Sequence, residues 1–139
     1  MRFFYCAHSE KVGKITQDGI MADENGTIPV IIVDKMFLMH QFVIDSYAYE
    51  ILGIEEYCYF EISPKGISGE ISDTSISDVF APFYKSLKQR SIQKQFLTPQ
   101  MTDRYESMGL GIGIFLVENK DKFNETYKKK ILEYAEELK

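Results

Sequence analysis

The sequence has no tryptophan and only two cysteines and two histidines in 139 residues. Cys6 and Cys58 are far apart, and each lies within an apolar run. We therefore predict two buried thiols in a reducing compartment rather than a disulfide. A zinc site would have to draw on these cysteines together with His8 and His40, and none of the four stands at ligand spacing from another. No metal is expected.

Long apolar runs are lacking as well. The longest mainly apolar stretch, Met36 to Ile44, is interrupted by His40 and Gln41 and is well short of a membrane-spanning helix. The first residues form only a short apolar run before the charged residues Glu10 and Lys11, unlike a signal peptide. We therefore expect a cytoplasmic protein with no membrane partner.

Positive charge is not in excess either. Lys and Arg number 16 against 21 Asp and Glu, which gives a net charge of -5 and a sequence pI of about 5.1. A protein that coats nucleic acid needs clustered Lys and Arg, so nucleic acid is not expected as a partner, although a local basic groove stays open. Hydrophobic residues at 45% and charged residues at 27% are typical of a globular chain. With no repeat or linker, residues 1–139 are predicted to form a single domain.

Turn and cap residues divide the first hundred residues into short elements. Ser9 is predicted to cap a helix that Gly19 ends, and Asp45 or Ser46 to cap the second half of a later helix that Gly53 ends. Pro82 leaves residues 79–87 ambiguous between helix and strand. The predicted strands span 2–7, 28–33, 56–62, 67–71 and 92–98, and the predicted helices span 10–18 and 35–52.

Two further patterns complete the predicted fold. Residues 28–33 are a continuous β-branched run, which is typical of a strand covered on both faces. Residues 109–117 alternate Gly with apolar residues, which favours a packed strand over a dinucleotide-binding loop, and an amphipathic helix is predicted from Asn119. We predict an α+β fold of small mixed or antiparallel sheets with flanking helices, followed by a strand and an amphipathic helix in 101–139.

The densest basic cluster consists of Lys85, Lys88, Arg90 and Lys94, with aromatic residues between them. This composition can hold a phosphate backbone and stack bases, and a solvated surface loop explains the same charges. His8 stands where the first strand gives way to the first helix. An imidazole there can bond a ribose hydroxyl or a phosphate, or it can be a surface histidine with no ligand.

The stretch from Ala7 to Ile20, AHSEKVGKITQDGI, resembles the opening of the ADP-ribosyltransferase-like fold. In RNA 2′-phosphotransferases and DNA-targeting ADP-ribosyltransferase toxins, a strand that ends in His or Arg is followed by a short helix and a Gly-Ile or Gly-Leu turn. The resemblance continues through IPVIIVDK, the helix at 46–51 and YCYFEISPKGI, and it ends at IQKQFLTPQ, so that it covers residues 1–100.

The resemblance implies a nucleotide-sized cleft that binds NAD. His8 matches the residue that contacts NAD, and Tyr47 or Tyr49 would replace an aromatic residue that the second strand lacks. Gln93 and Gln95 stand where the family carries its catalytic Glu. An amide can bond a ribose hydroxyl but cannot offset the charge of an oxocarbenium ion, so a few kcal/mol of transition-state stabilisation would be missing.

Three hypotheses follow. The first is an ADP-ribosyltransferase-like domain with weak or no transferase activity, which binds NAD, ADP-ribose or a protein partner. The second is an active NAD-dependent ADP-ribosyltransferase that uses His8 and Gln95, with a carboxylate such as Glu61 or Glu106 reaching in from elsewhere. The third is an interaction domain with no small-molecule site.

Overall fold

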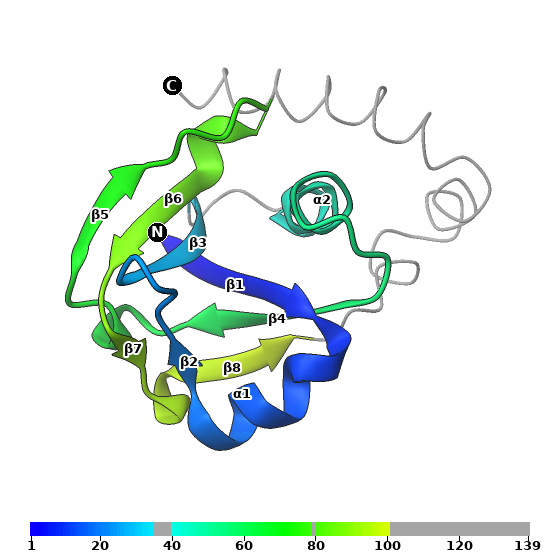
Figure 1. Ribbon diagram of the computed structural model, residues 1–139. Helices are drawn as coiled ribbons and strands as arrows, with labels where there is room; N and C mark the ends of the chain where they lie inside the picture. The colour runs from blue at the N-terminus through cyan, green and yellow to red at the C-terminus, as the bar shows by residue number, and fades with distance from the viewer. Residues whose placement is uncertain (35–39, 79, 101–139) are drawn as a thin grey trace.

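A six-stranded antiparallel sheet organises the chain (Figure 1). The computed structural model describes residues 1–34, 40–78 and 80–100. The order across the sheet is β5-β6-β3-β1-β4-β8, and each neighbouring pair is antiparallel. The strands are β1 (Arg2–His8), β3 (Thr27–Val33), β4 (Tyr57–Ile62), β5 (Glu70–Asp73), β6 (Tyr84–Lys88) and β8 (Leu97–Gln100).

Shorter elements flank this sheet. A second, two-stranded sheet joins β2 (Ile20–Met21) to β7 (Ser91–Ile92). The helices are α1 (Val12–Asp18), α2 (His40–Ser46) and the π-helical turn η2 (Tyr47–Ile51). The 3-10 turns are η1 (Ser9–Lys11), η3 (Pro64–Gly66), η4 (Ala81–Phe83) and η5 (Lys94–Phe96). The predicted α+β class is confirmed, while the strand and helix predicted in 101–139 lie outside the described residues.

The central strand β3 is buried on both faces of the sheet, as its continuous β-branched sequence predicts. Ile31 and Val33 belong to the hydrophobic cluster on the side of α2. Val30 and Ile32 belong to the cluster on the side of α1. Figure 1 shows α2 within the curve of the sheet and α1 on its other side. Because successive side chains of a strand point to opposite faces, one short apolar run contributes to both clusters.

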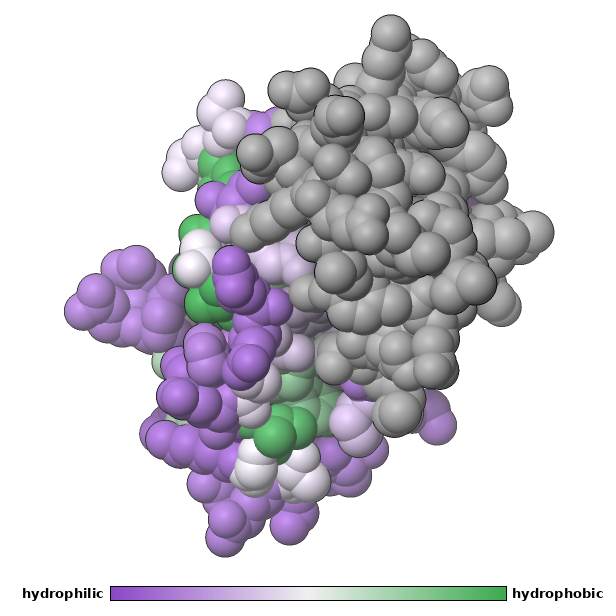
Figure 2. Space-filling view, turned by 90° about the vertical axis from the view of Figure 1, so that its right-hand side faces the viewer, coloured by the Kyte–Doolittle hydropathy of each residue, from purple (hydrophilic) through white to green (hydrophobic). Residues whose placement is uncertain are grey.

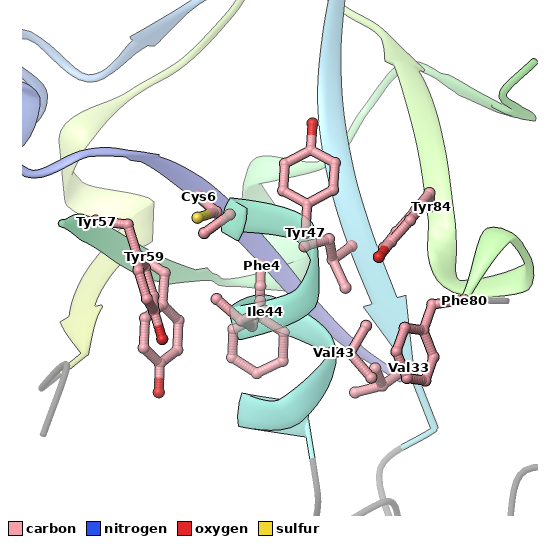
Figure 3. Packing of buried hydrophobic residues seen from close by; sticks show 12 residues of the cluster. Phe4, Cys6, Val33, Val43, Ile44, Tyr47, Tyr57, Tyr59, Phe80 and Tyr84 are labelled. Carbon is pink, nitrogen blue, oxygen red and sulfur yellow. The ribbon is translucent and has the colours of Figure 1, made fainter. Parts of the chain in front are cut away.

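The cluster under α2 is rich in aromatic rings. Figure 3 shows Phe4 of β1 and Ile44 of α2 at the centre, with Tyr57 and Tyr59 of β4 on one side and Tyr84 of β6 on the other. The Tyr47 ring meets that of Tyr84 edge to face at 5.1 Å between centroids. Cys6 is also buried here, and burial raises the pKa of its thiol. Cys58 is buried in the other cluster, so the predicted burial of both thiols is confirmed.

The prediction that Asp45 or Ser46 caps a second helix is wrong. Both residues are buried, the helical conformation continues through Ser46, and the Ser46 side chain makes no capping hydrogen bond. Instead, the Tyr57 hydroxyl donates a hydrogen bond to Asp45 Oδ1. A buried carboxylate needs such a donor because it has lost its contacts with water. The predicted end at Gly53 is confirmed: this residue has a φ of 67° and follows the last turn.

The first helix also begins differently from the prediction. His8, not Ser9, is the capping residue: its Nδ1 accepts a hydrogen bond of 3.1 Å from the Glu10 amide. A 3-10 turn then precedes α1. Gly19 ends the helix with a φ of 79°, and a Cβ atom at this position would overlap the carbonyl oxygen of Ile92. The tight packing between α1 and the segment after β7 therefore needs glycine.

The strand predicted at 92–98 is not continuous. It is divided into β7, the turn η5 and β8, and Pro99 lies within β8 instead of ending it. The strand predicted at 67–71 lies three residues later, as β5. The ambiguous residues around Pro82 form the turn η4 and then β6, because proline fits the first turn of a helix but has no amide to donate within a sheet.

The described surface on the side shown in Figure 2 is mainly hydrophilic, with small hydrophobic patches. Among the described residues, none of the helices is long and apolar enough to span a bilayer.

Candidate functional site

His8 lies at the carboxyl end of β1, with 38% of its side chain exposed. Besides capping η1, its Nδ1 lies 4.0 Å from Glu10 Oε2. Alternation along β1 places His8 on the same face as Phe4 and Cys6, which is the face covered by α2. Nδ1 of His8 therefore accepts the capping hydrogen bond, and Nε2 takes no part in this cap.

The two tyrosines lie on η2. Tyr47 is buried against the sheet, and burial raises the pKa of its hydroxyl to about 12. Tyr49 is half-buried. Because the Tyr47 ring is already packed against Tyr84, it does not offer a free face for stacking a nicotinamide ring.

Gln93 and Gln95 lie in the connection between β7 and β8, and both are exposed. Gln95 Nε2 donates a hydrogen bond of 2.5 Å to Gln93 Oε1. This connection packs beside α1, where Gly19 meets Ile92 and Lys94. The structure therefore places the glutamines on the α1 side of the sheet and Tyr47 on the α2 side, and it does not bring all the predicted site residues together.

Glu61, the carboxylate considered as a substitute, is held by Arg2. Arg2 Nη2 donates to Glu61 Oε1 at 2.7 Å and Arg2 Nε to Glu61 Oε2 at 3.0 Å. The hydrogen bond from Arg2 lowers the pKa of Glu61. Beside this pair, the His40 ring stacks on Phe4 with centroids 4.8 Å apart, and burial lowers the pKa of His40 to about 4. This cluster joins β1, β4 and α2, and its carboxylate already has a bidentate partner. Within the described ranges, no group of three His, Cys, Asp or Glu side chains is arranged to hold a metal ion.

A cleft of about 450 Å³ lies beside the link between β6 and β7. Lys88 ends β6 and Ser91 begins β7, with Gln89 and Arg90 between them, and we call residues 88–90 the Lys88–Arg90 link. On one side of the link, Lys88 pairs with Glu70 at the start of β5. The loop 63–69 is thereby brought against the link and supplies the facing wall of the cleft, which includes Lys65. This volume lies within the range of small-molecule sites.

Gln89 fixes the two walls of the cleft to each other. Its Oε1 accepts hydrogen bonds from the amides of Ser68 and Gly69, at 2.8 and 3.0 Å. Its Nε2 donates to the carbonyl oxygens of Gly66 and Ser91, at 2.7 and 2.8 Å. These four hydrogen bonds form when the chain folds. The shape of the cleft is therefore set before any ligand binds.

Three cations surround the cleft, namely Lys65, Lys88 and Arg90. All three side chains are exposed. Within the described part of the chain, the ion pairs are Arg2–Glu61, His8–Glu10 and Lys85–Asp73, so none of the three cations at the cleft belongs to an ion pair. No carboxylate is found among the described residues that line the cleft. Three basic residues therefore gather at this cleft on a chain of net charge -5, with Glu70 opposite Lys88 on the neighbouring strand β5.

The sequence indicated part of this cleft. Two of its cations, Lys88 and Arg90, belong to the predicted basic cluster, and Gln93 lines the same cleft. The other members of that cluster do not: Lys85 pairs with Asp73 at 2.5 Å, and Lys94 is exposed on η5. Lys65 and Gln89 were missed, because each is an ordinary polar residue until the strands are paired.

Comparisons of the chain with protein-family models, with curated proteins and with solved structures find no match.

Proposed function

We propose that this protein binds a phosphate-bearing small ligand of nucleotide size in the cleft between Lys65 and the Lys88–Arg90 link. The observation that carries the proposal is the grouping of three cations around a cavity of about 450 Å³. Among the described residues, these cations have no ion-pair partner and the lining of the cavity contains no carboxylate. Like charges that are brought together by folding repel one another, and an anion removes that repulsion.

The chemistry of the lining suits phosphate. Arg90 can present two parallel N–H donors to phosphate oxygens, and the two lysines act as point charges. The hydroxyls of Ser68 and Ser91 add neutral donors at the same cleft. Because the cleft is open to solvent, each cation contributes only about 1 kcal/mol, and the affinity depends on salt.

NAD and ADP-ribose are the first ligands to test, since the sequence resembles the ADP-ribosyltransferase-like fold and both ligands carry a diphosphate. Gln93 at the wall of the cleft is a partner for a hydroxyl of the second ribose, the one that NAD and ADP-ribose carry beyond their diphosphate. Our proposal is binding with weak or no transfer, because an amide lacks the negative charge that would stabilise an oxocarbenium ion.

The test is calorimetric titration of ADP-ribose and of NAD at low and at physiological salt. We expect Lys65→Ala, Lys88→Ala and Arg90→Ala each to weaken binding about fivefold, which corresponds to about 1 kcal/mol. Lys14→Ala is the matched control, because Lys14 is exposed on α1 and does not line the cleft. This control is expected to leave the affinity unchanged.

His8→Ala distinguishes the cleft from the site implied by the resemblance. If His8→Ala abolishes binding while Arg90→Ala does not, the ligand lies on the α2 side of the sheet and the proposed cleft is wrong. If neither ligand nor inorganic pyrophosphate binds at millimolar concentration, the proposed function is refuted. The hypothesis of an interaction domain then takes its place.

A further inference from the structure

A second hollow, of about 430 Å³, lies on the other side of the Lys88–Arg90 link. Lys88, Gln89 and Arg90 line both hollows, so the link forms their shared wall. The β2–β3 turn, residues 22–26, supplies the opposite wall. Its position is fixed by the hydrogen bond of 2.9 Å from the Ala22 amide to the Arg90 carbonyl oxygen, and by the pairing of Thr27 with Lys88.

The chemistry of the second hollow differs from that of the first. Met21 lines it with 63% of its surface exposed, which offers an apolar contact. Glu24 also lines it and is exposed, and its carboxylate makes no hydrogen bond or ion pair within the described part of the chain. Asp23, by contrast, is used by the turn itself, since its Oδ1 accepts from the amides of Asn25 and Thr27.

We infer that the two hollows together take one nucleoside phosphate, an inference that rests on the proposed function. The phosphate lies in the first hollow between Lys65 and Arg90. The ribose crosses the link and donates its hydroxyls to the Glu24 carboxylate, and the base lies against Met21. A carboxylate is a suitable partner for a ribose because it accepts from two hydroxyls at once, and nucleotide-binding sites of other folds use it in this way.

The position of Glu24 makes a distinguishing prediction. A carboxylate close to bound phosphate repels it, so a hollow built for phosphate alone would bind more weakly because of Glu24. In a nucleoside phosphate site the hydroxyl contact outweighs this repulsion. Ligands of equal charge that differ only in their hydroxyls therefore separate the two effects.

The experiment compares ADP with 2′,3′-dideoxy-ADP by calorimetry, in the wild-type chain and in Glu24→Gln. We expect ADP to bind about tenfold more tightly than the dideoxy analogue in the wild type, the difference expected for hydrogen bonds to a charged group. In Glu24→Gln this ratio is expected to fall toward one, while the dideoxy analogue binds as well as before or better.

Glu70→Gln is the matched control, because Glu70 is exposed and faces Lys88 from β5, on the side of the first hollow. Removing the Glu70 charge is expected to strengthen the binding of both ligands equally, so that the ratio of the ADP affinity to the dideoxy-ADP affinity stays unchanged. Circular dichroism checks that each variant is folded.

Equal affinity of ADP and its dideoxy analogue for the wild type would refute this inference. If Lys65→Ala still weakens the binding of both ligands, the proposed function stands without this inference. A ratio that survives Glu24→Gln would also refute the role of Glu24. Absence of binding by either ligand and by pyrophosphate would refute both the inference and the proposed function.

Discussion

Replacing Gln89 with alanine is expected to destabilise the fold at the cleft. Four hydrogen bonds of 2.7–3.0 Å join this side chain to backbone groups of the loop 63–69 and of β7. Gln89→Ala leaves the amides of Ser68 and Gly69 and the carbonyl oxygens of Gly66 and Ser91 without this partner. The two walls of the cleft then lose these hydrogen bonds, while the pairing of β5 with β6 still joins them.

The expected loss of stability follows from the number of these hydrogen bonds. Each hydrogen bond has a net value of about 1 kcal/mol, so four give an upper limit of about 4 kcal/mol. Water can reach part of this half-buried site and replace some partners. We therefore expect the free energy of unfolding to fall by about 2 kcal/mol.

Urea unfolding followed by fluorescence and circular dichroism measures this change at constant slope. Gln89→Glu is the second variant: it keeps the acceptor for the two amides but places a carboxylate oxygen against the two carbonyl oxygens, so it should be no more stable than Gln89→Ala. Gln17→Ala, at an exposed position of α1, is the control and should change stability by less than about 0.5 kcal/mol. A Gln89→Ala loss as small as that of the control would refute the role assigned to Gln89.

Three other predictions concern stability. Burial lowers the pKa of His40 from 6.5 to about 4, so the unfolded chain takes up this proton at a higher pH than the folded chain does. The free energy of unfolding is therefore unaffected by His40 above pH 6.5 and falls as the pH drops toward 4. Because the ring is partly exposed, solvent screening reduces this loss to about 1–2 kcal/mol. His40→Phe, which keeps an aromatic ring against Phe4, should reduce this acid sensitivity in urea unfolding at pH 7 and pH 4.5, and an unchanged pH dependence would contradict the assignment. Gly19→Ala should cost about 2 kcal/mol, because it forces an unfavourable φ and meets the Ile92 carbonyl oxygen. Gly13→Ala, where a Cβ would meet nothing within 4 Å, should instead stabilise α1 by up to about 1 kcal/mol in the same assay.

The candidate site could be predicted only in part. Lys88 and Arg90 stand close together in the sequence, so a local count of charges finds them. Lys65 and Gln89 cannot be found in this way, because they meet only through the β5–β6 pairing, and the hydrogen bond from Ser68 to Gln89 joins residues 21 positions apart. The separation of Gln93 from Tyr47 also depends on which face of the sheet each segment covers.

The secondary-structure errors have a similar origin. Asp45 and Ser46 are residue types that commonly cap helices, but tertiary packing buries them, and Tyr57 of strand β4 donates a hydrogen bond to Asp45. The run 92–98 has the composition of one strand, yet its first part pairs with β2 and its last part with β4. Local propensity cannot distinguish one strand from two that belong to different sheets.

The sequence by itself determined the α+β class, the strands β1, β3 and β4, the burial of both cysteines and the ends of the helical segments at Gly19 and Gly53. These features depend on local properties, namely β-branched and aromatic runs and the backbone freedom of glycine. The tertiary structure decided the strand order, the cap formed by His8 and the cleft at the Lys88–Arg90 link. The cleft depends on long-range pairing, because its three cations come together only when β5, β6 and β7 bring their loops together.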